Sequence, residues 1–447
     1  MELETPWFVR FITERLKHAG YKAYIVGGAL RNALLHLPQN DWDVATSASS
    51  GEIKEVFSDT KLFALKHNTV TLINSGWNFE VTPFRGEKDS LVDDLRRRDF
   101  TINAMAFDPG KRELIDPLGG KEDIKLKSLR AAGNPAMRFK EDPIRLLRAV
   151  RLAVELGFTI EAYTFQTLTS MAPNINSVSQ ERIREELMKI LLAPKPSSGF
   201  NLMIKTGLLS HFLPEIMEGR LKRQGSYHTY TILKHTLETL DRANPDPVLR
   251  LSALFHDIAK PRVRRKLKGE WRFYGHEQQS ALLTGDIMER LKFSKKMTRK
   301  VQNLVLNHMI NYSSTWSDAA VRRLVQRVGP ENINELIMLR RADLLAHGSA
   351  TKSAELLDEL ESRIEEQLAG PMLLKTTKLA IGGREVMDVL GFQPGPMVGK
   401  SLDFLREIII DNPELNEPKK LIDILKDLAN VPQSRPHKTK SSLSLDL

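Results

Sequence analysis

The sequence predicts an α/β head at the N-terminus followed by a remainder that is almost entirely helical. In the first ~125 residues, a helical apolar spacing precedes the runs AYIVGG, DWDVAT and TVTLINSGWNFEVTPF, whose buried or alternating patterns are typical of strands. From Glu141 onward, long helical periods follow one another and strand patterns nearly vanish. A chain of 447 residues is too long for one ordinary core, so we expect several domains.

Composition shifts mark the expected domain boundaries. Breaks fall near LLAPKPSSGF, around ANPDPV and at LAGPM, and the final stretch is polar and carries Pro and Ser. We therefore predict a head over residues 1–125, an all-α neck over 126–198, a helical domain over 199–348, a C-terminal helical region over 349–430 and disorder over 431–447.

Composition also limits the chemistry. The chain has no cysteine, which excludes disulfide partners and thiolate chemistry and leaves Asp, Glu and His as metal ligands. No apolar run resembles a signal peptide or a membrane span, so we expect a soluble, cytoplasmic protein without a membrane partner. The net charge of +10 favours a polyanionic partner such as nucleic acid. The oligomeric state is not predicted.

Two short segments of the head are candidates for phosphate chemistry. On a strand, Asp41 and Asp43 share a face and present two carboxylates, as Mg²⁺ and nucleotide phosphates require, although a solvated turn has the same pattern. Gly27 and Gly28 end a buried strand where a helix begins, so their backbone amides can approach a phosphate. A plain strand-to-helix turn explains the glycines equally well.

Charged residues further along extend this set. Arg98 and Asp99 in RRRDFTINAM combine a forked cation for phosphate or ribose oxygens with a carboxylate that can orient it; an exposed charge cluster is the alternative. Asp142 is expected to cap a helix on whose first turn Arg145 lies, which is also the pattern of a simple ion pair. Glu80 is expected to face water from a strand edge and is left out of the site.

Five ordered segments, GGALRN, DWDVAT, RRRDFTINAM, DPLGG and EDPIRLLRAVRLAVELGF, resemble the class II transfer RNA nucleotidyltransferase and bacterial poly(A) polymerase family of the DNA polymerase β superfamily. The resemblance covers roughly residues 20 to 200 and implies a polymerase β-type head with a small mixed sheet. It implies a metal- and nucleotide-binding set, namely Asp41 and Asp43 for two Mg²⁺ ions, Gly27, Gly28 and Arg31 for the triphosphate, and Arg98 and Asp99 on the ribose side. Asn32 stands where the family usually has an acid that orients the arginine.

The resemblance also implies how a base is chosen. It places Asp142 and Arg145 on the motif that pairs with the Watson–Crick edge of the incoming base, which suits the amine of cytosine or adenine and hence CTP or ATP. Family members that add all of CCA carry a flexible loop, tied to accepting ATP, where this chain has only 11 residues between Arg85 and Arg97. We therefore predict addition of CC to the 3′ end of tRNA, with full CCA addition, A addition and poly(A) synthesis as alternatives.

A second set of residues lies in the helical part. His235, His256, Asp257, His276, His308 and Asp343 occur in the order that resembles HD-domain metal-dependent phosphohydrolases. Such ligands suit Mn²⁺, Ni²⁺, Zn²⁺ or Mg²⁺, and the implied substrates are 2′,3′-cyclic or terminal phosphates. Ordinary helix-face residues, or an HD domain kept as an RNA-binding scaffold, are the alternatives.

Two further features complete the analysis. Residues 260–272 carry seven basic side chains against one acid, which is typical of a phosphate contact or a solvated loop. By resemblance, the C-terminal region 349–430 binds RNA. The rival functions for the whole chain are a phosphohydrolase whose head only grips RNA and a non-catalytic tRNA-binding protein.

Overall fold

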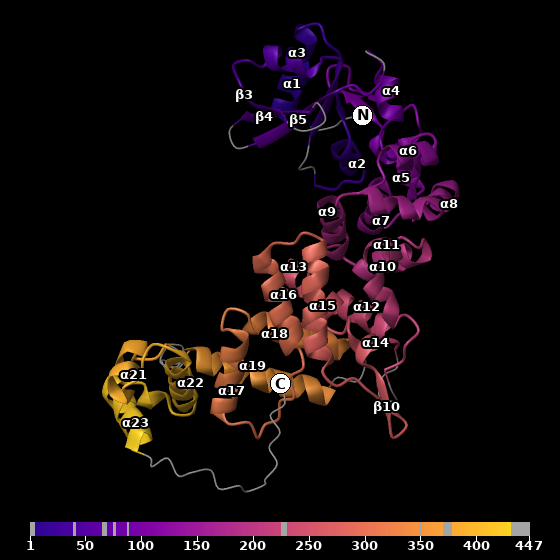
Figure 1. Cartoon of the computed structure of the whole chain (residues 1–447). Helices are drawn as coiled ribbons and strands as arrows, with labels where there is room; N and C mark the ends of the chain where they lie inside the picture. The colour runs from indigo at the N-terminus through magenta and orange to yellow at the C-terminus, as the bar shows by residue number, and fades with distance from the viewer. Residues whose placement is uncertain are drawn as a thin grey trace. The chain divides into compact units, whose positions relative to one another are not determined.

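The computed structural model describes residues 5–38, 42–64, 69–74, 77–86, 89–224, 230–347, 351–369 and 378–430. The chain forms two compact units, Met1–Leu306 and Asn307–Leu447, and each is described by itself (Figure 1). Among the described helices, none has the length and apolarity needed to cross a membrane. The predicted disorder over 431–447 lies outside the described residues.

The head is built on one mixed sheet. Its strands are β1 (Ala23–Val26), β2 (Asp43–Thr46), β3 (Lys61–Ala64), β4 (Val70–Asn74), β5 (Trp77–Pro83), β6 (Ala106–Asp108) and β7 (Glu113–Ile115). Their order in the sheet is β3-β4-β5-β2-β1-β6-β7. Strands β2 and β5 pair in parallel and the other neighbours pair antiparallel, so the predicted α/β head with a small mixed sheet is confirmed.

Helices pack against this sheet and cap its loops. They are α1 (Trp7–His18), α2 (Gly28–Leu34), α3 (Ser50–Val56), α4 (Leu91–Arg96), the 3-10 turn η2 (Thr101–Asn103) and α5 (Gly120–Lys125). Val9, Ile12 and Leu16 lie on one stripe of α1 and are buried, as the three-to-four spacing of an amphipathic helix requires. Helices α1 and α3 lie together against the sheet (Figure 1).

The segment DPLGG forms a capped turn at the start of α5. Both carboxylate oxygens of Asp116 accept backbone amide hydrogens, from Gly120 at 2.8 Å and from Lys121 at 2.8 Å. A Cβ atom on Gly120 would lie 2.2 Å from the carbonyl oxygen of Thr101, closer than any contact allows. Only glycine therefore permits α5 to pack so tightly against η2.

The rest of the first unit is a succession of packed helices. They are α6 (Pro135–Glu141), α7 (Arg145–Leu156), α8 (Ala162–Met171), η3 (Ala172–Ser177), α9 (Gln180–Leu191), α10 (Pro196–Lys205), α11 (Leu209–Phe212), η4 (Pro214–Gly219), α12 (Ile232–Arg242), α13 (Pro247–Phe255), α14 (Lys260–Val263), α15 (His276–Arg290) and α16 (Lys295–Asn307). Helix α7 packs on α9 and α10, and α12 packs on α10 and α13. The predicted helical remainder is confirmed, and the proposed domain boundaries stay predictions.

Short strands interrupt the helical part. Strand β8 (Ser128–Leu129) pairs in parallel with β9 (Thr159–Ile160), and β10 (Arg265–Leu267) pairs antiparallel with β11 (Glu270–Arg272). Sequence analysis gave no strand in this basic stretch because its charges hide any alternation of apolar residues.

The second unit is helical in its described residues. It contains α17 (Asp318–Val328), α18 (Ile333–Ala346), α19 (Thr351–Ala369), α21 (Gly383–Leu390), α22 (Pro396–Asp411), η5 (Pro413–Leu415) and α23 (Pro418–Asn430). Val386, Leu405, Ile409 and Leu421 are buried between α21, α22 and α23. The guanidinium of Arg322 donates to the carbonyl of Ile410 at 2.7 Å and so satisfies the end of α22.

We expect Gly120→Ala to destabilise the head by about 1 to 3 kcal/mol, because the added methyl group overlaps a backbone carbonyl that cannot turn away. Urea denaturation of the full chain measures the loss. The matched control is Gly51→Ala in α3, where the nearest atom to an added Cβ is 3.9 Å away and alanine favours the helix. Equal stability of the two variants would contradict the steric explanation.

Candidate active site and metal cluster

A cavity of about 830 Å³ opens between the sheet and the first helices of the neck. Its lining brings together residues from separate segments, namely Val26, Gly27, Gly28, Asp43, Thr69, Glu80, Thr82, Pro83, Phe84, Arg85, Arg97, Arg98, Asp99, Asn103, Glu141, Asp142, Arg145, Arg148 and Arg182. Most of the predicted nucleotide-binding residues are in this set. Asp41 lies outside the described residues, so its predicted role stays a prediction.

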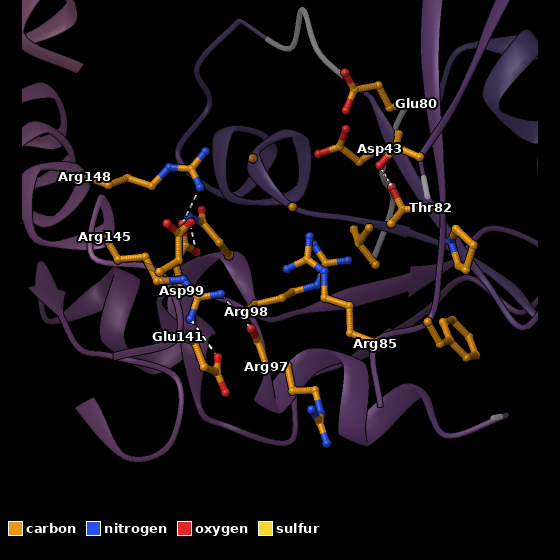
Figure 2. A pocket seen from close by; sticks show the side chains of 18 of the residues that line it. Asp43, Glu80, Thr82, Arg85, Arg97, Arg98, Asp99, Glu141, Arg145 and Arg148 are labelled. Atoms are coloured by element: carbon orange, nitrogen blue, oxygen red, sulfur yellow. Dashed lines mark hydrogen bonds and ion pairs between the residues drawn. The ribbon is translucent and has the colours of Figure 1, made fainter. Parts of the chain in front are cut away.

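Carboxylates gather on one wall of the cavity. Asp43 begins β2 and is directly opposite Glu80 of the parallel strand β5, so the two residues share a face of the sheet. Figure 2 shows their carboxylates close together, with Thr82 below them. Glu80 is exposed, as predicted, but it lies on an interior strand of the sheet rather than at an edge, and it lines the cavity beside Asp43. Oxygen ligands of this kind suit Mg²⁺.

Gly27 is fitted to its position by two constraints. Its φ of +81° lies in the region that favours glycine. A Cβ atom there would lie 2.7 Å from Oδ2 of Asp43, so a side chain would displace the carboxylate. The backbone of Gly27 thus lies directly against Asp43, and Gly28 lies beside Arg31, a cation that suits a phosphate.

Arg31 lies beside this turn without lining the cavity. Its Nε and NH2 groups donate to Oδ1 of Asn32 at 3.1 and 2.8 Å, and NH1 donates to Oδ1 of Asn103 at 2.8 Å. The amide of Asn32 therefore orients Arg31 even though it lacks the charge of the family's usual acid. Its contact with a triphosphate stays a prediction.

Asp94 positions the cationic side of the cavity. Its Oδ2 accepts from Nε and NH2 of Arg98, both at 3.0 Å, and its Oδ1 accepts from the backbone amide of Arg85 at 3.1 Å. Figure 2 shows the guanidinium groups of Arg98 and Arg85 pointing into the middle of the cavity. One buried carboxylate thus fixes an arginine and the end of β5 together.

Asp99 joins the head to α7. Its Oδ1 accepts from Asn103 Nδ2 at 3.0 Å and from the Phe100 amide at 2.8 Å, and its Oδ2 is 3.2 Å from NH1 of Arg148. Burial raises the pKa of Asp99, but Arg148 and these hydrogen bonds outweigh it and bring the pKa below its ordinary value. Asp99 in turn raises the pKa of Arg148.

The two predicted base-selecting residues lie on the neck side of the cavity. Asp142 accepts a bidentate pair from Arg182 of α9, with both contacts at 2.9 Å. Arg145 is buried and donates to the carbonyls of Arg138 and Arg97, each at 3.1 Å. The predicted N-cap was wrong: Asp142 ends α6, and Ile144 precedes the first residue of α7.

The helical part contains the second predicted cluster. Asp257 lies centrally, with Oδ2 at 3.2 Å from His256 Nε2 and 3.6 Å from His235 Nε2, and Oδ1 at 3.4 Å from His276 Nε2. The two Nε2 atoms of His235 and His256 are 3.3 Å apart. All four side chains are buried.

The geometry of this cluster fits a divalent metal. Nδ1 of His256 lies 2.9 Å from the carbonyl of Ala253 and Nδ1 of His276 lies 2.8 Å from that of Phe273, so each ring keeps Nε2 for a ligand. Ligands at ~2.1 Å from a metal are about 3.0 to 3.4 Å from one another. Three of the observed separations fall in this range, and the fourth, between Asp257 and His235, is slightly longer at 3.6 Å. Burial raises the pKa of Asp257, but His256 and Lys260 lower it well below its ordinary value.

The remaining predicted ligands belong to the second unit. His308 and Asp343 are both buried there. Asp343 forms an ion pair with Arg340 at 2.5 Å, and its carbonyl is 2.8 Å from Nδ1 of His347. Their membership of the metal site stays a prediction.

Comparison with known families agrees with this architecture. Residues 23–130 match the poly A polymerase head domain, residues 157–219 match the probable RNA and SrmB-binding site of polymerase A, and residues 225–348 match the HD domain. The fold and site define a polymerase-type nucleotidyltransferase head joined to an HD-bearing helical region.

Relatives match over nearly their whole length. A protein named A-adding tRNA nucleotidyltransferase from Deinococcus radiodurans is 34% identical over 411 residues, covering 86% of this chain and 91% of that protein. A CCA-adding enzyme from Streptococcus thermophilus is 29% identical over 435 residues, covering 94% and 96%. The crystal structure of the Bacillus stearothermophilus CCA-adding enzyme in complex with CTP has a TM-score of 0.71 at 26% identity, covering 95% of this chain and 98% of that one. The chain belongs to the class II tRNA nucleotidyltransferase and poly(A) polymerase family.

We expect Arg148→Leu to lower the free energy of unfolding by roughly 1 to 3 kcal/mol at about pH 7, because it leaves the buried Asp99 carboxylate without its cation. The stabilisation from a lowered pKa is present above the ordinary value of about 3.9 and is lost as the pH falls through the folded-state pKa. The difference between wild type and variant should therefore shrink below about pH 4.

Thermal denaturation across this pH range measures the effect. The control is Arg15→Leu, which breaks the more exposed Arg15–Asp59 pair of the same head and should cost less. A loss for Arg148→Leu that does not change with pH would remove Asp99 as its cause.

Proposed function

We propose that the chain adds two cytidines to the 3′ end of tRNA from CTP. The observation that supports addition of only two cytidines is the short link between Arg85 and Arg97, after β5. One carboxylate, that of Asp94, binds a residue at each side of this link. Asp94 binds the backbone of Arg85 before the link and the side chain of Arg98 after it. By family resemblance, the longer loop that is tied to accepting ATP is missing here.

The reaction is a nucleotidyl transfer. The oxygen of the RNA 3′ hydroxyl attacks the α-phosphorus of CTP, a phosphodiester bond forms, the bond to pyrophosphate breaks, and the hydroxyl proton is released. Asp43 and Glu80, with Asp41 as predicted, would hold Mg²⁺, which when bound neutralises charge on the reacting phosphates. Arg98 and Arg85 hold positive charge toward the centre of the cavity, where they stabilise the triphosphate.

Base selection is assigned to Arg145 and Asp142. NH1 of Arg145 donates to Arg138 and Glu141, and NH2 donates once, to Arg97. Two N–H groups of Arg145, the one on Nε and the second one on NH2, donate to no protein acceptor within the described residues. They remain available for N3 and O2 of cytosine. Asp142 accepts from the cytosine amine, and Arg182 orients that carboxylate.

A specific observation favours a second candidate. The relative from Deinococcus radiodurans, named as A-adding, is 34% identical over 411 residues. Adenine carries the same amine that Asp142 accepts, so A addition uses the same residues with a different nucleotide. The Streptococcus thermophilus relative is named a CCA-adding enzyme, so full CCA addition is the other alternative.

The deciding experiment supplies tRNA that ends at its discriminator base with CTP, ATP or both, and sizes the product. We expect two added residues with CTP and no further growth when ATP is present. Three residues with both nucleotides would mean CCA addition. Growth by one residue on tRNA already ending in CC, with ATP alone, would mean A addition, and a long tail would mean poly(A) synthesis.

Matched variants assign the site in the same assay. Asp43→Ala should abolish incorporation, because it removes a metal ligand without changing the buried core. His256→Ala with Asp257→Ala should incorporate at the wild-type rate, since these residues belong to the separate cluster.

We further propose that the histidine–aspartate cluster binds a divalent metal and hydrolyses phosphate esters at RNA ends. The convergence of three Nε2 atoms on one buried carboxylate supports metal binding. A metal there, such as Mn²⁺, Ni²⁺, Mg²⁺ or Zn²⁺, supplies an activated water. The substrates implied by family resemblance are 2′,3′-cyclic and terminal phosphates, which block a 3′ hydroxyl.

We expect the purified chain to carry about one divalent ion that His256→Ala with Asp257→Ala removes, as measured by elemental mass spectrometry. Hydrolysis of a 2′,3′-cyclic nucleotide should disappear with it, while the Asp43→Ala variant keeps both. A bound ion without hydrolysis would leave the cluster structural. No bound ion in the wild type would sink the assignment.

A further inference from the structure

The hairpin formed by β10 and β11 projects from the helical part beside α14 (Figure 1). Its strands pair with each other and with no other strand among the described residues. It is inserted between Asp257 and His276, and Phe273, directly after β11, holds the ring of His276 through its carbonyl. The hairpin thus ends where the cluster begins.

The hairpin carries positive charge that the fold does not neutralise. Arg265, Lys266 and Lys268 are exposed and form no ion pair within the part of the chain that the structure describes. Arg265 lies directly opposite Arg272, an arrangement that destabilises a two-stranded ladder because like charges repel. Only Arg272 is compensated, by Glu270 at 2.6 Å.

The turn at the tip of the hairpin places a lysine in a backbone conformation that lysine rarely adopts. Lys268 and Gly269 both have positive φ, at +48° and +83°, as in the two-residue turn that most favours Asn-Gly. A lysine in this conformation costs stability relative to asparagine or glycine. Its side chain is exposed, so the tip carries a cation where a residue better suited to the turn would stabilise the fold.

An aromatic ring at the base of the hairpin contacts two of its cations. The guanidinium carbon of Arg264 lies 3.4 Å from the centroid of the Trp271 ring, and Lys266 Nζ lies 5.8 Å from the same ring. This cation–π contact joins the residue before β10 to β11, and no acidic side chain takes part in it. Leu267 and Tyr274 expose apolar and aromatic surface beside the cations, at 48% and 73%. Cations mixed with exposed aromatic surface suit a ribose-phosphate chain.

We propose that this hairpin is an RNA-binding element that grips the phosphate backbone of the substrate through Arg265, Lys266 and Lys268. The inference rests on the proposed RNA substrate and adds a contact distant from the cavity in the head. Phosphate contacts of this kind carry affinity rather than sequence preference, and salt weakens them.

The test is binding of tRNA to the full chain without nucleotide, measured by fluorescence anisotropy over a range of salt. For Arg265→Ala, Lys266→Ala and Lys268→Asn combined, the slope of log affinity against log salt should become shallower by about 2 to 3, with about tenfold weaker binding at low salt. Lys268→Asn alone should reduce the slope by about 1. This single variant suits the turn better than lysine and therefore folds.

The matched control removes three exposed lysines from other helices of the same unit, Lys54, Lys205 and Lys296, each replaced by alanine. It should leave the slope close to that of the wild type. A wild-type slope in the hairpin variant, or an equal change in the control, overturns the proposal. CTP incorporation at saturating tRNA should be unchanged in all three variants. A wild type that incorporates no nucleotide refutes the proposed function instead.

Discussion

The buried carboxylate of Asp99 connects the parts of the cavity that must act together. It accepts from Asn103, which also accepts from Arg31 beside the phosphate-approaching turn, and it pairs with Arg148 on α7. Helix α7 begins with Arg145, for which we propose base selection, one turn earlier. A shift of α7 relative to the sheet would break this ion pair, so the polar network holds the sheet side and the α7 side of the cavity in register.

Burial raises the free-energy cost of any charge in this network that loses its partner. Arg148 is shared between Asp99 and Glu186, and Glu186 also accepts from Arg151 at 2.6 Å. Charges in such surroundings are stable only while each has a partner, because the cost of an unmatched buried charge exceeds that of a lost surface pair. The same rule applies to Asp257, whose neighbours are histidines and Lys260.

The fold class followed from the sequence, and so did the placement of most predicted nucleotide-binding residues at the cavity, because both depend on local patterns. Gly27, Asp43, Arg98 and Asp99 lie on segments whose order and spacing are readable along the chain. Glu80 could not be assigned this way, since it reaches Asp43 only through the parallel pairing of two strands that are distant in sequence.

Two other misjudgements have similar physical causes. The cap predicted for Asp142 failed because Arg182, forty residues later, takes both of its oxygens. The β10–β11 hairpin was missed because its strands are chosen by a turn and a stacked arginine rather than by apolar alternation. In each case a long-range or side-chain interaction overrode the local preference.

The position of Asp94 has an evolutionary consequence. Because Asp94 on α4 binds both Arg85 and Arg98, the stretch between Arg85 and the start of α4 can vary in length while the two arginines keep their places. Insertions at such a point cost little free energy, since the entropy of closing a loop grows only slowly with its length. The length of this segment can therefore change while the walls of the cavity stay in place.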